Sequence, residues 1–267
     1  MKNFPIAAAL SVCILPLLDP TAALAQQKVS KLVSVRQNGV VRVCQNPAYY
    51  AISFRNPKSG ELEGIDVDLS KEFAKELNVK LQIVETNFGT FIADLQADKC
   101  DIGMFAVAAT LKRGQAVEFS DPYLQSGVYG VVKNDSKVQK WEDVDQPGDR
   151  VTTTLGTFMD DVMKGYLKKA TYQTVTPPAD GLSDVAAGKA DVYITDYPTS
   201  IRLKKEFDWA RLLAPAEPLA VTPYAYVVAP GDQVWLNYIN LFVRTIHNDG
   251  RLKKAADKYN LGPMVSK

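Results

Sequence analysis

Short apolar runs and longer amphipathic stretches alternate along the first half of the chain. Residues 40–43, 80–84 and 101–107 are rich in β-branched and other apolar side chains, as expected of buried strands. A helical stretch separates the first two runs, and a shorter one precedes the third. Strands that alternate with helices form βαβ units, so we predict at least three parallel strands in one sheet.

The first helical stretch has a clear polarity. Leu69, Phe73 and Leu77 recur at four-residue spacing, which is typical of the buried face of a helix. The helix is predicted to begin near Asp66 and Asp68, where negative charge is favourable to the helix dipole.

The second half repeats this alternation with different residues. Residues 150–154 and 191–194 are predicted strands. The predicted helices cover 158–167, 182–187, a segment opened by Pro198, 233–247 and 251–259. We find no residue-level repeat between the halves, and the chain is predicted to be an α/β protein throughout.

Two extended runs with tyrosines, 129–132 and 224–228, flank the second block. If both runs pass between lobes, the block between them is an insertion. We therefore predict that 26–130 and 223–267 form lobe one and that 131–222 form lobe two. Two connecting strands of this kind would act as a hinge.

Residues 1–25 are predicted to be a secretory signal peptide. Lys2 precedes an apolar run over 6–18, and the small-x-small pattern that signal peptidase cleaves ends at Ala25. A membrane anchor is the alternative, but the run is short for a bilayer and contains Pro16. The mature protein is expected in the periplasm.

Composition excludes several classes of function. The chain has 31 basic and 30 acidic side chains, a net charge of +1, which argues against a nucleic-acid-binding surface. Its one histidine, His247, leaves little for a catalytic triad or a histidine metal site. We expect no metal and no cofactor.

Two cysteines, Cys44 and Cys100, remain after removal of the signal peptide. In an oxidising compartment an even pair of cysteines can form a disulfide. Buried free thiols are the alternative. We predict the bridge.

Several motifs along residues 35–260 together resemble the extracellular solute-binding proteins of family 3, the amino-acid receptors of ABC importers. They are Asn46-Pro47-Ala48-Tyr49, 60–69, Thr110-Leu111-Lys112-Arg113, 119–123, Gly156-Thr157, 187–191 and Asp196. Their order and spacing carry the resemblance. It implies the type II periplasmic-binding-protein fold, a small-molecule ligand and an ABC-transporter membrane permease as partner. We expect a monomer.

The resemblance also implies a ligand site. Arg113 stands where the family binds a carboxylate, and a guanidinium matches a carboxylate bidentately. Thr110 before it is expected to cap a helix. Asp196 matches the family's ammonium acceptor, and Tyr49 and Phe88 match the walls around the ligand side chain.

One departure from the family bears on the ligand. Thr157 and its preceding glycine offer backbone donors, as in the family. However, Phe105, Ala106 and Ala108 stand where hydroxyl-bearing residues are usual, and Phe158 replaces a common threonine. A pocket with fewer hydroxyls favours an apolar or aromatic amino acid, or a related small carboxylate.

Each of these residues has a structural alternative. Arg113 beside Lys112 could be a solvated surface cation. Asp196 could cap the helix that Pro198 opens. Tyr49 and Phe88 could be core aromatics of one lobe.

Binding without catalysis is the predicted function, and two rivals stay open. One is a cyclohexadienyl dehydratase-like enzyme, since those periplasmic enzymes look like family 3 receptors. The other is an accessory protein of a periplasmic methanol-oxidation-like dehydrogenase system. The placement of Cys44 and Cys100 resembles that in such accessory proteins.

Overall fold

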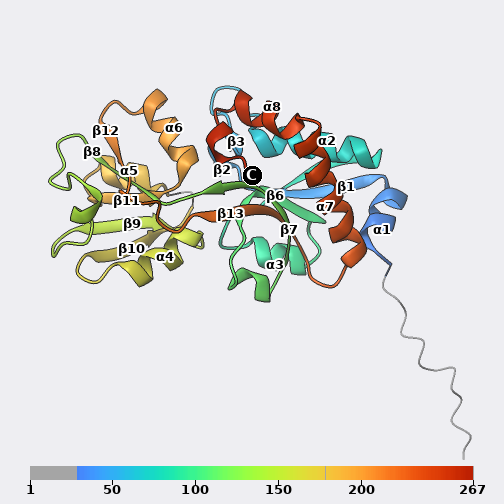
Figure 1. The fold of residues 1–267 in the computed structure, drawn as a ribbon, viewed down its shortest axis with the longest axis horizontal. Helices are drawn as coiled ribbons and strands as arrows, with labels where there is room; N and C mark the ends of the chain where they lie inside the picture. Colours follow the sequence, from blue (N-terminus) through green and yellow to red (C-terminus); the bar gives the residue numbers. More distant parts are fainter. Residues whose placement is uncertain (1–28, 178, 267) are drawn as a thin grey trace, which may run out of the picture.

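The protein consists of two α/β lobes that lie side by side (Figure 1). The structure, a computed structural model, describes residues 29–177 and 179–266. The predicted signal peptide, residues 1–25, lies outside the described residues. Among the helices of the described ranges, none has the length and apolar character that a membrane span requires. The predicted two-lobed α/β architecture is confirmed.

The first lobe is built on a five-stranded sheet with the order β5-β1-β6-β13-β7, and a small sheet of β2, β3 and β4 lies beside it. β5, β1 and β6 are parallel, whereas β13 is antiparallel to both its neighbours. The elements of this lobe are α1 (Lys31–Asn38), β1 (Val40–Gln45), β2 (Ala48–Tyr49), β3 (Ser53–Arg55), β4 (Leu62–Glu63), α2 (Ile65–Leu77), β5 (Lys80–Glu85), α3 (Phe91–Gln96), β6 (Ile102–Ala108), the 3-10 helix η2 (Arg113–Gln115), β7 (Glu118–Ser126), β13 (Thr222–Val228), α7 (Gln233–Asn248), α8 (Arg251–Lys258) and the 3-10 helix η4 (Gly262–Met264).

The second lobe has a sheet of the same size with the order β10-β9-β11-β8-β12. β10, β9 and β11 are parallel, and β8 runs antiparallel to β11 and β12. Its elements are β8 (Tyr129–Lys133), the 3-10 helix η3 (Trp141–Asp143), β9 (Arg150–Thr154), α4 (Phe158–Tyr166), β10 (Thr171–Val175), α5 (Gly181–Ala186), β11 (Val192–Thr195), α6 (Tyr197–Glu206) and β12 (Ala210–Leu213).

Burial explains why the predicted strands and helices form where they do. Every residue of β6 is buried, as expected of a central strand covered on both faces. The predicted apolar face of α2, including Leu69 and Phe73, is buried as well. Phe73 packs against Trp235 of α7, with ring centroids 5.6 Å apart. Helices far apart in the sequence therefore share one core in the first lobe.

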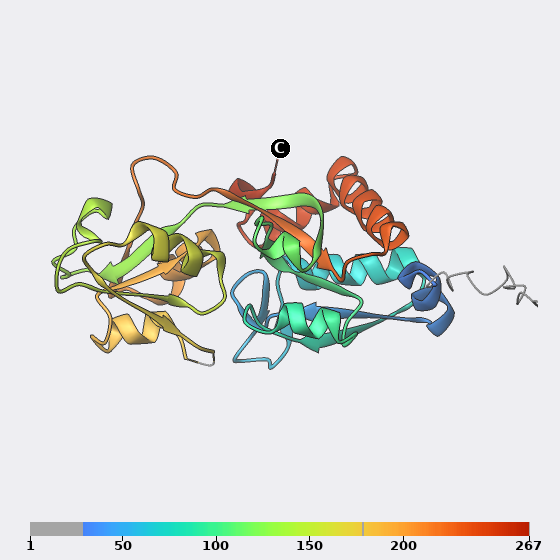
Figure 2. The ribbon, with the colours of Figure 1, turned by 90° about the horizontal axis from the view of Figure 1, so that it is seen from below.

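Two short segments connect the lobes, and both run along the same side of the molecule (Figure 2). The chain leaves β7 at Ser126 and enters β8 at Tyr129, and it returns through residues 214–221. The boundary expected at residue 130 lies inside the second sheet, because Tyr129 and its neighbour pair with β11. The run expected to cross at 224–228 lies in the first sheet. The connections are thus residues 127–128 and 214–221, and both lie outside the predicted hinge strands.

The two lobes share an arginine–aspartate pair at equivalent places, which the sequence did not reveal as a repeat. In the first lobe, Asp101 Oδ2 accepts hydrogen bonds from the backbone N and the Nε of Arg42, at 2.8 and 3.2 Å. In the second, Asp191 Oδ2 accepts the same two bonds from Arg150, at 2.8 and 3.0 Å. Each pair joins a strand to the turn before its parallel neighbour.

A disulfide joins Cys44 of β1 to Cys100, as expected from the sequence. Their Cα atoms are 5.6 Å apart, because β1 and β6 are adjacent parallel strands in which Cys44 pairs with Gly103. Both side chains are buried. The bridge therefore ties the centre of the first sheet to the loop that enters β6.

Candidate functional site

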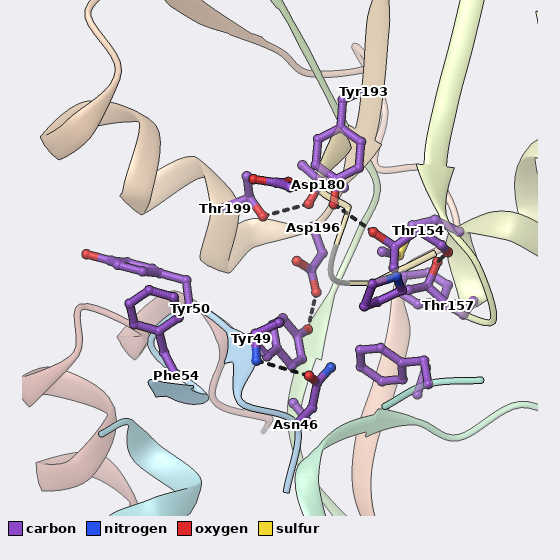
Figure 3. Close-up of a pocket in the computed structure, with 18 of the residues that line it drawn as sticks. Asn46, Tyr49, Tyr50, Phe54, Thr154, Thr157, Asp180, Tyr193, Asp196 and Thr199 are labelled. Carbon is purple, nitrogen blue, oxygen red and sulfur yellow. Dashed lines mark hydrogen bonds between the residues drawn. The ribbon is translucent and has the colours of Figure 1, made fainter. Parts of the chain in front are cut away.

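A cavity of about 260 Å³ lies between the lobes (Figure 3). The eight residues predicted from the sequence all line it: Tyr49, Phe88, Ala106, Ala108, Arg113, Thr157, Phe158 and Asp196. Five of these come from the first lobe and three from the second. The structure thus brings the predicted site residues together.

Arg113 is buried at the start of η2, so it is not a solvated surface cation. Its Nη1 donates to the carbonyl oxygen of Ala108 at 2.9 Å, and its Nη2 donates to that of Gly156 at 2.8 Å. Within the described residues it forms no salt bridge with a carboxylate. Burial lowers the pKa of its guanidinium. The cavity therefore holds a desolvated cation whose guanidinium, among the described residues, donates to neutral carbonyl groups and is flanked by rings.

The face of the Arg113 guanidinium lies over two aromatic rings. Its Cζ is 5.7 Å from the ring centroid of Phe88 and 5.5 Å from that of Phe91. Such cation–π contacts stabilise a buried guanidinium and hold its plane in one orientation. The edge of the guanidinium is left for hydrogen bonds.

Gly156 brings the second lobe close to this arginine. It has a positive φ of 78°, and a Cβ added to it would lie 2.8 Å from the carbonyl oxygen of Phe88. Only glycine permits both the left-handed backbone and this approach of main chain to main chain. The Gly156 carbonyl can thus reach Arg113 across the lobe boundary, and Thr157 follows as the N-cap residue of α4.

Asp196 is buried at the N-terminus of α6, but its side chain makes no capping hydrogen bond. Instead it turns toward the first lobe, where its Oδ2 accepts hydrogen bonds from the hydroxyls of Tyr49 and, at 2.6 Å, Tyr224 (Figure 3). Burial raises the pKa of this carboxyl, whereas the tyrosine hydrogen bonds act in the opposite direction. The side chain is therefore part of the cavity wall and not a helix cap.

The aromatic residues form walls on both sides of the cavity. Tyr49 packs edge-on against Phe88, with centroids 5.5 Å apart, and Phe158 packs against Tyr224 at 6.0 Å. Phe105, expected beside the ligand, does not line the cavity and is buried behind Phe88 at 5.3 Å. An apolar wall therefore exists, but Phe105 only supports it.

Sequence reasoning missed a polar part of the wall in the second lobe. The Tyr193 hydroxyl lies 3.1 Å from Oγ1 of Thr154, and the hydroxyls of Thr195 and Thr199 are 2.6 Å apart. Burial raises the pKa of Tyr193 to about 12. Thr154 and Thr195 are the last residues of β9 and β11. Ligands of open α/β sheets bind at such carboxyl ends of strands, and this signal was available in the sequence.

Sequence reasoning also missed an arginine that packs on aromatic rings across the lobe boundary. Arg202 of α6 lies over the rings of Tyr50 and Phe54 from the first lobe, at 5.7 and 5.4 Å. It also lies over Phe207 at 5.1 Å, and its Nε donates to Glu206. Arg202, Tyr50 and Phe54 line the same cavity. No sequence spacing relates α6 to the β2–β3 hairpin, so this contact depends on the tertiary structure.

Two α/β lobes with a cavity lined by both define a solute-binding architecture, in which both lobes contribute to the ligand site. The chain belongs to the bacterial extracellular solute-binding proteins, family 3, whose family model matches residues 41–262. The family predicted from the sequence is confirmed.

Relatives of this chain include both binding proteins and an enzyme. Cyclohexadienyl dehydratase of Pseudomonas aeruginosa is 26% identical over 88% of this chain and 87% of that protein. The ABC transporter glutamine-binding protein GlnH of Bacillus subtilis is 25% identical, over 88% of this chain and 86% of its own length. A crystal structure of the ancestral amino acid-binding protein AncCDT-1, described as a precursor of cyclohexadienyl dehydratase, superposes with a TM-score of 0.80. It is 31% identical and covers 86% of this chain and 99% of its own.

Proposed function

We propose that this protein binds a free amino acid between its lobes and presents it to the membrane permease of an ABC importer. The observation that carries the proposal is Arg113, a buried guanidinium with no carboxylate partner among the described residues. A desolvated cation is costly unless an anion or strong acceptors meet it. A ligand carboxylate in the cavity would meet it.

The opposite charge for a zwitterion is present in the same cavity. Asp196 is buried there and presents a carboxylate to the space between the lobes. An ammonium group beside it would form a charge-assisted hydrogen bond. Arg113 and Asp196 come from different lobes, so one small zwitterion could contact both.

The walls support an apolar or aromatic amino acid, or a related carboxylate, as the ligand. Phe88 and Phe158 contribute rings, and Ala106 and Ala108 contribute small apolar surfaces that leave room for a bulky side chain. Residues 1–25 resemble a signal peptide, which supports a periplasmic location for this ligand capture.

A thermal-unfolding screen tests the ligand class. The protein without residues 1–25 is heated with each of the twenty amino acids and with matched acids that lack the amino group. A ligand at one hundred times its dissociation constant should stabilise the fold by about 2.7 kcal/mol. We expect phenylalanine, tyrosine or leucine to stabilise more than arginine, histidine or glutamine. The opposite order would overturn the proposed side-chain preference, and no stabilisation by any of them would overturn amino-acid binding.

A dehydratase activity is a second candidate, favoured by the dehydratase relative and by the chemistry of Asp196. For prephenate or arogenate, an acid catalyst must give a proton to the leaving hydroxyl, so that it departs as water while the ring carboxylate leaves as carbon dioxide and its bonding electrons complete the aromatic ring. Burial raises the pKa of Asp196, which favours its protonated form. Arg113 would hold a substrate carboxylate in the same cavity.

Incubation with prephenate or arogenate tests this second candidate. Loss of the substrate absorbance with wild-type protein, and none with Asp196→Asn, would support a dehydratase. Unchanged absorbance with protein that binds an amino acid in the thermal screen would exclude it for these substrates.

A further inference from the structure

The floor of the cavity contains an irregularity in the central strand β6. Gly103 pairs with Val227 of β13, and Val107 pairs with Ala225, so β6 places three residues where β13 places one. Ala106, inside this bulge, has a positive φ of 51°. The left-handed conformation is unfavourable for alanine because Cβ approaches the carbonyl oxygen, so other contacts must hold it. Bulges of this kind re-aim side chains beside functional sites.

Asp66 of α2 holds the bulge from below. Its Oδ2 accepts a hydrogen bond from the backbone N of Ala106 at 2.9 Å and another from the hydroxyl of Tyr123 at 2.5 Å. Its Oδ1 lies 3.4 Å from the hydroxyl of Tyr226, and the Ala106 N–H is shared with Tyr123 at 3.1 Å. The Ala106 amide therefore bonds to a side-chain network and not to β13.

The bulge is continuous with the ligand-binding wall. Ala106 and Ala108 both line the cavity. The carbonyl oxygen of Ala108 accepts a hydrogen bond from Nη1 of Arg113 at 2.9 Å. Ala106 is thus two residues from Ala108, whose carbonyl oxygen accepts a hydrogen bond from the arginine that holds the proposed carboxylate ligand.

Asp66 is fully buried, and no cation faces it among the described residues. Tyr123 from β7 and Tyr226 from β13 are the titratable groups in contact with its carboxylate, and both are neutral at physiological pH. Four cations on elements packed against α2 pair with other carboxylates: Arg42 of β1 with Asp101, Arg55 of β3 with Glu85 of β5, and Arg251 and Lys258 of α8 with Glu76 and Asp68 of α2. Within the described residues the Asp66 carboxylate is held by hydrogen bonds and by no ion pair.

We propose that Asp66 is a positioning residue of the ligand site, whose carboxylate holds the β6 bulge and thereby sets the place of Ala106, Ala108 and Arg113. The assignment rests on the proposed function of the cavity. Asp66 does not touch the ligand in this proposal. It acts through the strand that lies between it and the cavity.

The contact between Asp66 and Ala106 should depend on pH near neutrality. Burial raises the pKa of Asp66 to about 7, although its hydrogen bonds from Tyr123, Ala106 and Tyr226 act in the opposite direction. Protonation removes the negative charge that attracts the Ala106 amide, so the bulge and the Arg113 side chain should respond to pH between about 6 and 8.

Nuclear magnetic resonance tests this without any ligand. The full mature chain is labelled with ¹⁵N-alanine and ¹⁵N-arginine, and the Ala106 amide and Arg113 Nε signals are followed from pH 5 to 9. We expect both to shift with a common midpoint near pH 7. Asp66→Asn should abolish both shifts, whereas Asp94→Asn, which alters a carboxylate paired with Lys99, should leave them unchanged.

Two outcomes would overturn the assignment. Absence of a shift at Ala106 from pH 5 to 9 would contradict control of the bulge by the charge of Asp66. Titration at Ala106 with a constant Arg113 signal would make Asp66 a local structural residue only.

Tyr123→Phe is the second variant, for the case in which Asp66→Asn does not fold. It removes one hydrogen bond to the charged form of Asp66, so the midpoint should move to higher pH. Since no arm uses a ligand, failure here is distinguishable from failure of the amino-acid screen.

Discussion

Arg113 shows how one residue can determine a binding site. It is buried, and in the described part of the chain its acceptors are the neutral carbonyl oxygens of Ala108 and Gly156. One of these acceptors is in each lobe, so the guanidinium is held in one orientation when the lobes are together. Pre-oriented donors of this kind reduce the entropy cost of binding.

We expect Arg113→Ala to lower the affinity for the best ligand of the thermal screen by about 30-fold to several thousand-fold. The reason is that the ligand carboxylate would remain buried without its partner, a loss of about 2–5 kcal/mol. Arg113→Lys should restore only part, because an ammonium cannot form the two-pronged contact. Calorimetric titration measures these affinities.

The matched control is Arg244→Ala, which removes an exposed arginine paired with Asp121 on the first lobe. Exposed ion pairs contribute little, so its affinity should equal that of the wild type. Equal affinity of Arg113→Ala and wild type would rule out the carboxylate role.

The buried carboxyl of Asp66 should also make the stability of the protein depend on pH. The folded protein keeps the Asp66 proton up to about pH 7, whereas an ordinary aspartate releases it near 3.8. The folded state therefore binds more protons between these values, and stability falls as pH rises through this window. The loss amounts to up to about 4 kcal/mol, since each pKa unit corresponds to about 1.4 kcal/mol.

Urea unfolding of wild type and Asp66→Asn from pH 4 to 8 measures this contribution. As the pH rises to 7, the unfolding free energy of the wild type should fall relative to that of Asp66→Asn. Above pH 7 the difference between the two proteins should stay constant. Asp94 should give the opposite pH dependence. Burial raises the pKa of this carboxyl, but the hydrogen bonds from Lys99 and Thr86 lower it by more, so the net shift is downward. The stability that Asp94 contributes is therefore lost only below about pH 4. A difference that does not vary with pH would contradict the burial of an ionisable Asp66.

At the scale of elements, the disulfide connects β1 with the loop that enters β6. The bridged cysteines are 56 positions apart, so the bond restricts a long loop in the unfolded chain. Cys44→Ala combined with Cys100→Ala should lower the unfolding free energy by about 2–4 kcal/mol. Urea unfolding with and without a reductant measures it.

The double variant serves as its own control, because reductant should not change its stability further. Wild-type protein unfolded without reductant should show no reactive thiol from this pair. Two reactive thiols per mature chain, and equal stability of both proteins, would contradict a bridge in solution.

At the scale of the whole molecule, contacts across the cavity join two lobes that only two short segments connect covalently. Lys112 pairs with Asp161 at 2.6 Å, and Arg202 lies over Tyr50 and Phe54. Backbone of one connection contacts the other, where the N of Val128 donates to the carbonyl oxygen of Leu219 at 3.1 Å. Short connections that touch each other allow bending about one axis.

We expect the lobes to close on the ligand by bending at residues 126–128 and 214–221. Small-angle scattering should then show a smaller radius of gyration with the best ligand of the screen than without it. Arg113→Ala at the same ligand concentration should show no change, which separates closure from a solvent effect. An unchanged radius in wild type, with binding measured independently, would count against hinge closure.

Local patterns in the sequence were enough to predict the architecture and much of the candidate site. Strand and helix periods depend on neighbouring residues, so the alternation that builds both sheets was visible in the chain. Arg113 and Asp196 were found because the resemblance depends on ordered local motifs. The cysteine pair was found because an exported chain with two cysteines tends to bridge them.

Only the tertiary structure decided what depends on contacts between distant segments. Tyr49 reaches Asp196 across 147 positions, and Asp66 reaches Tyr226 across 160. From the sequence, Asp66 was one of two acidic residues at the start of a helix, but burial beneath a bulged strand gives it a different role. The sequence placed Tyr129 in lobe one, whereas its pairing with Thr195 places it in the second sheet. Register, bulges and burial arise from the packing of the whole chain, and no local pattern contains them.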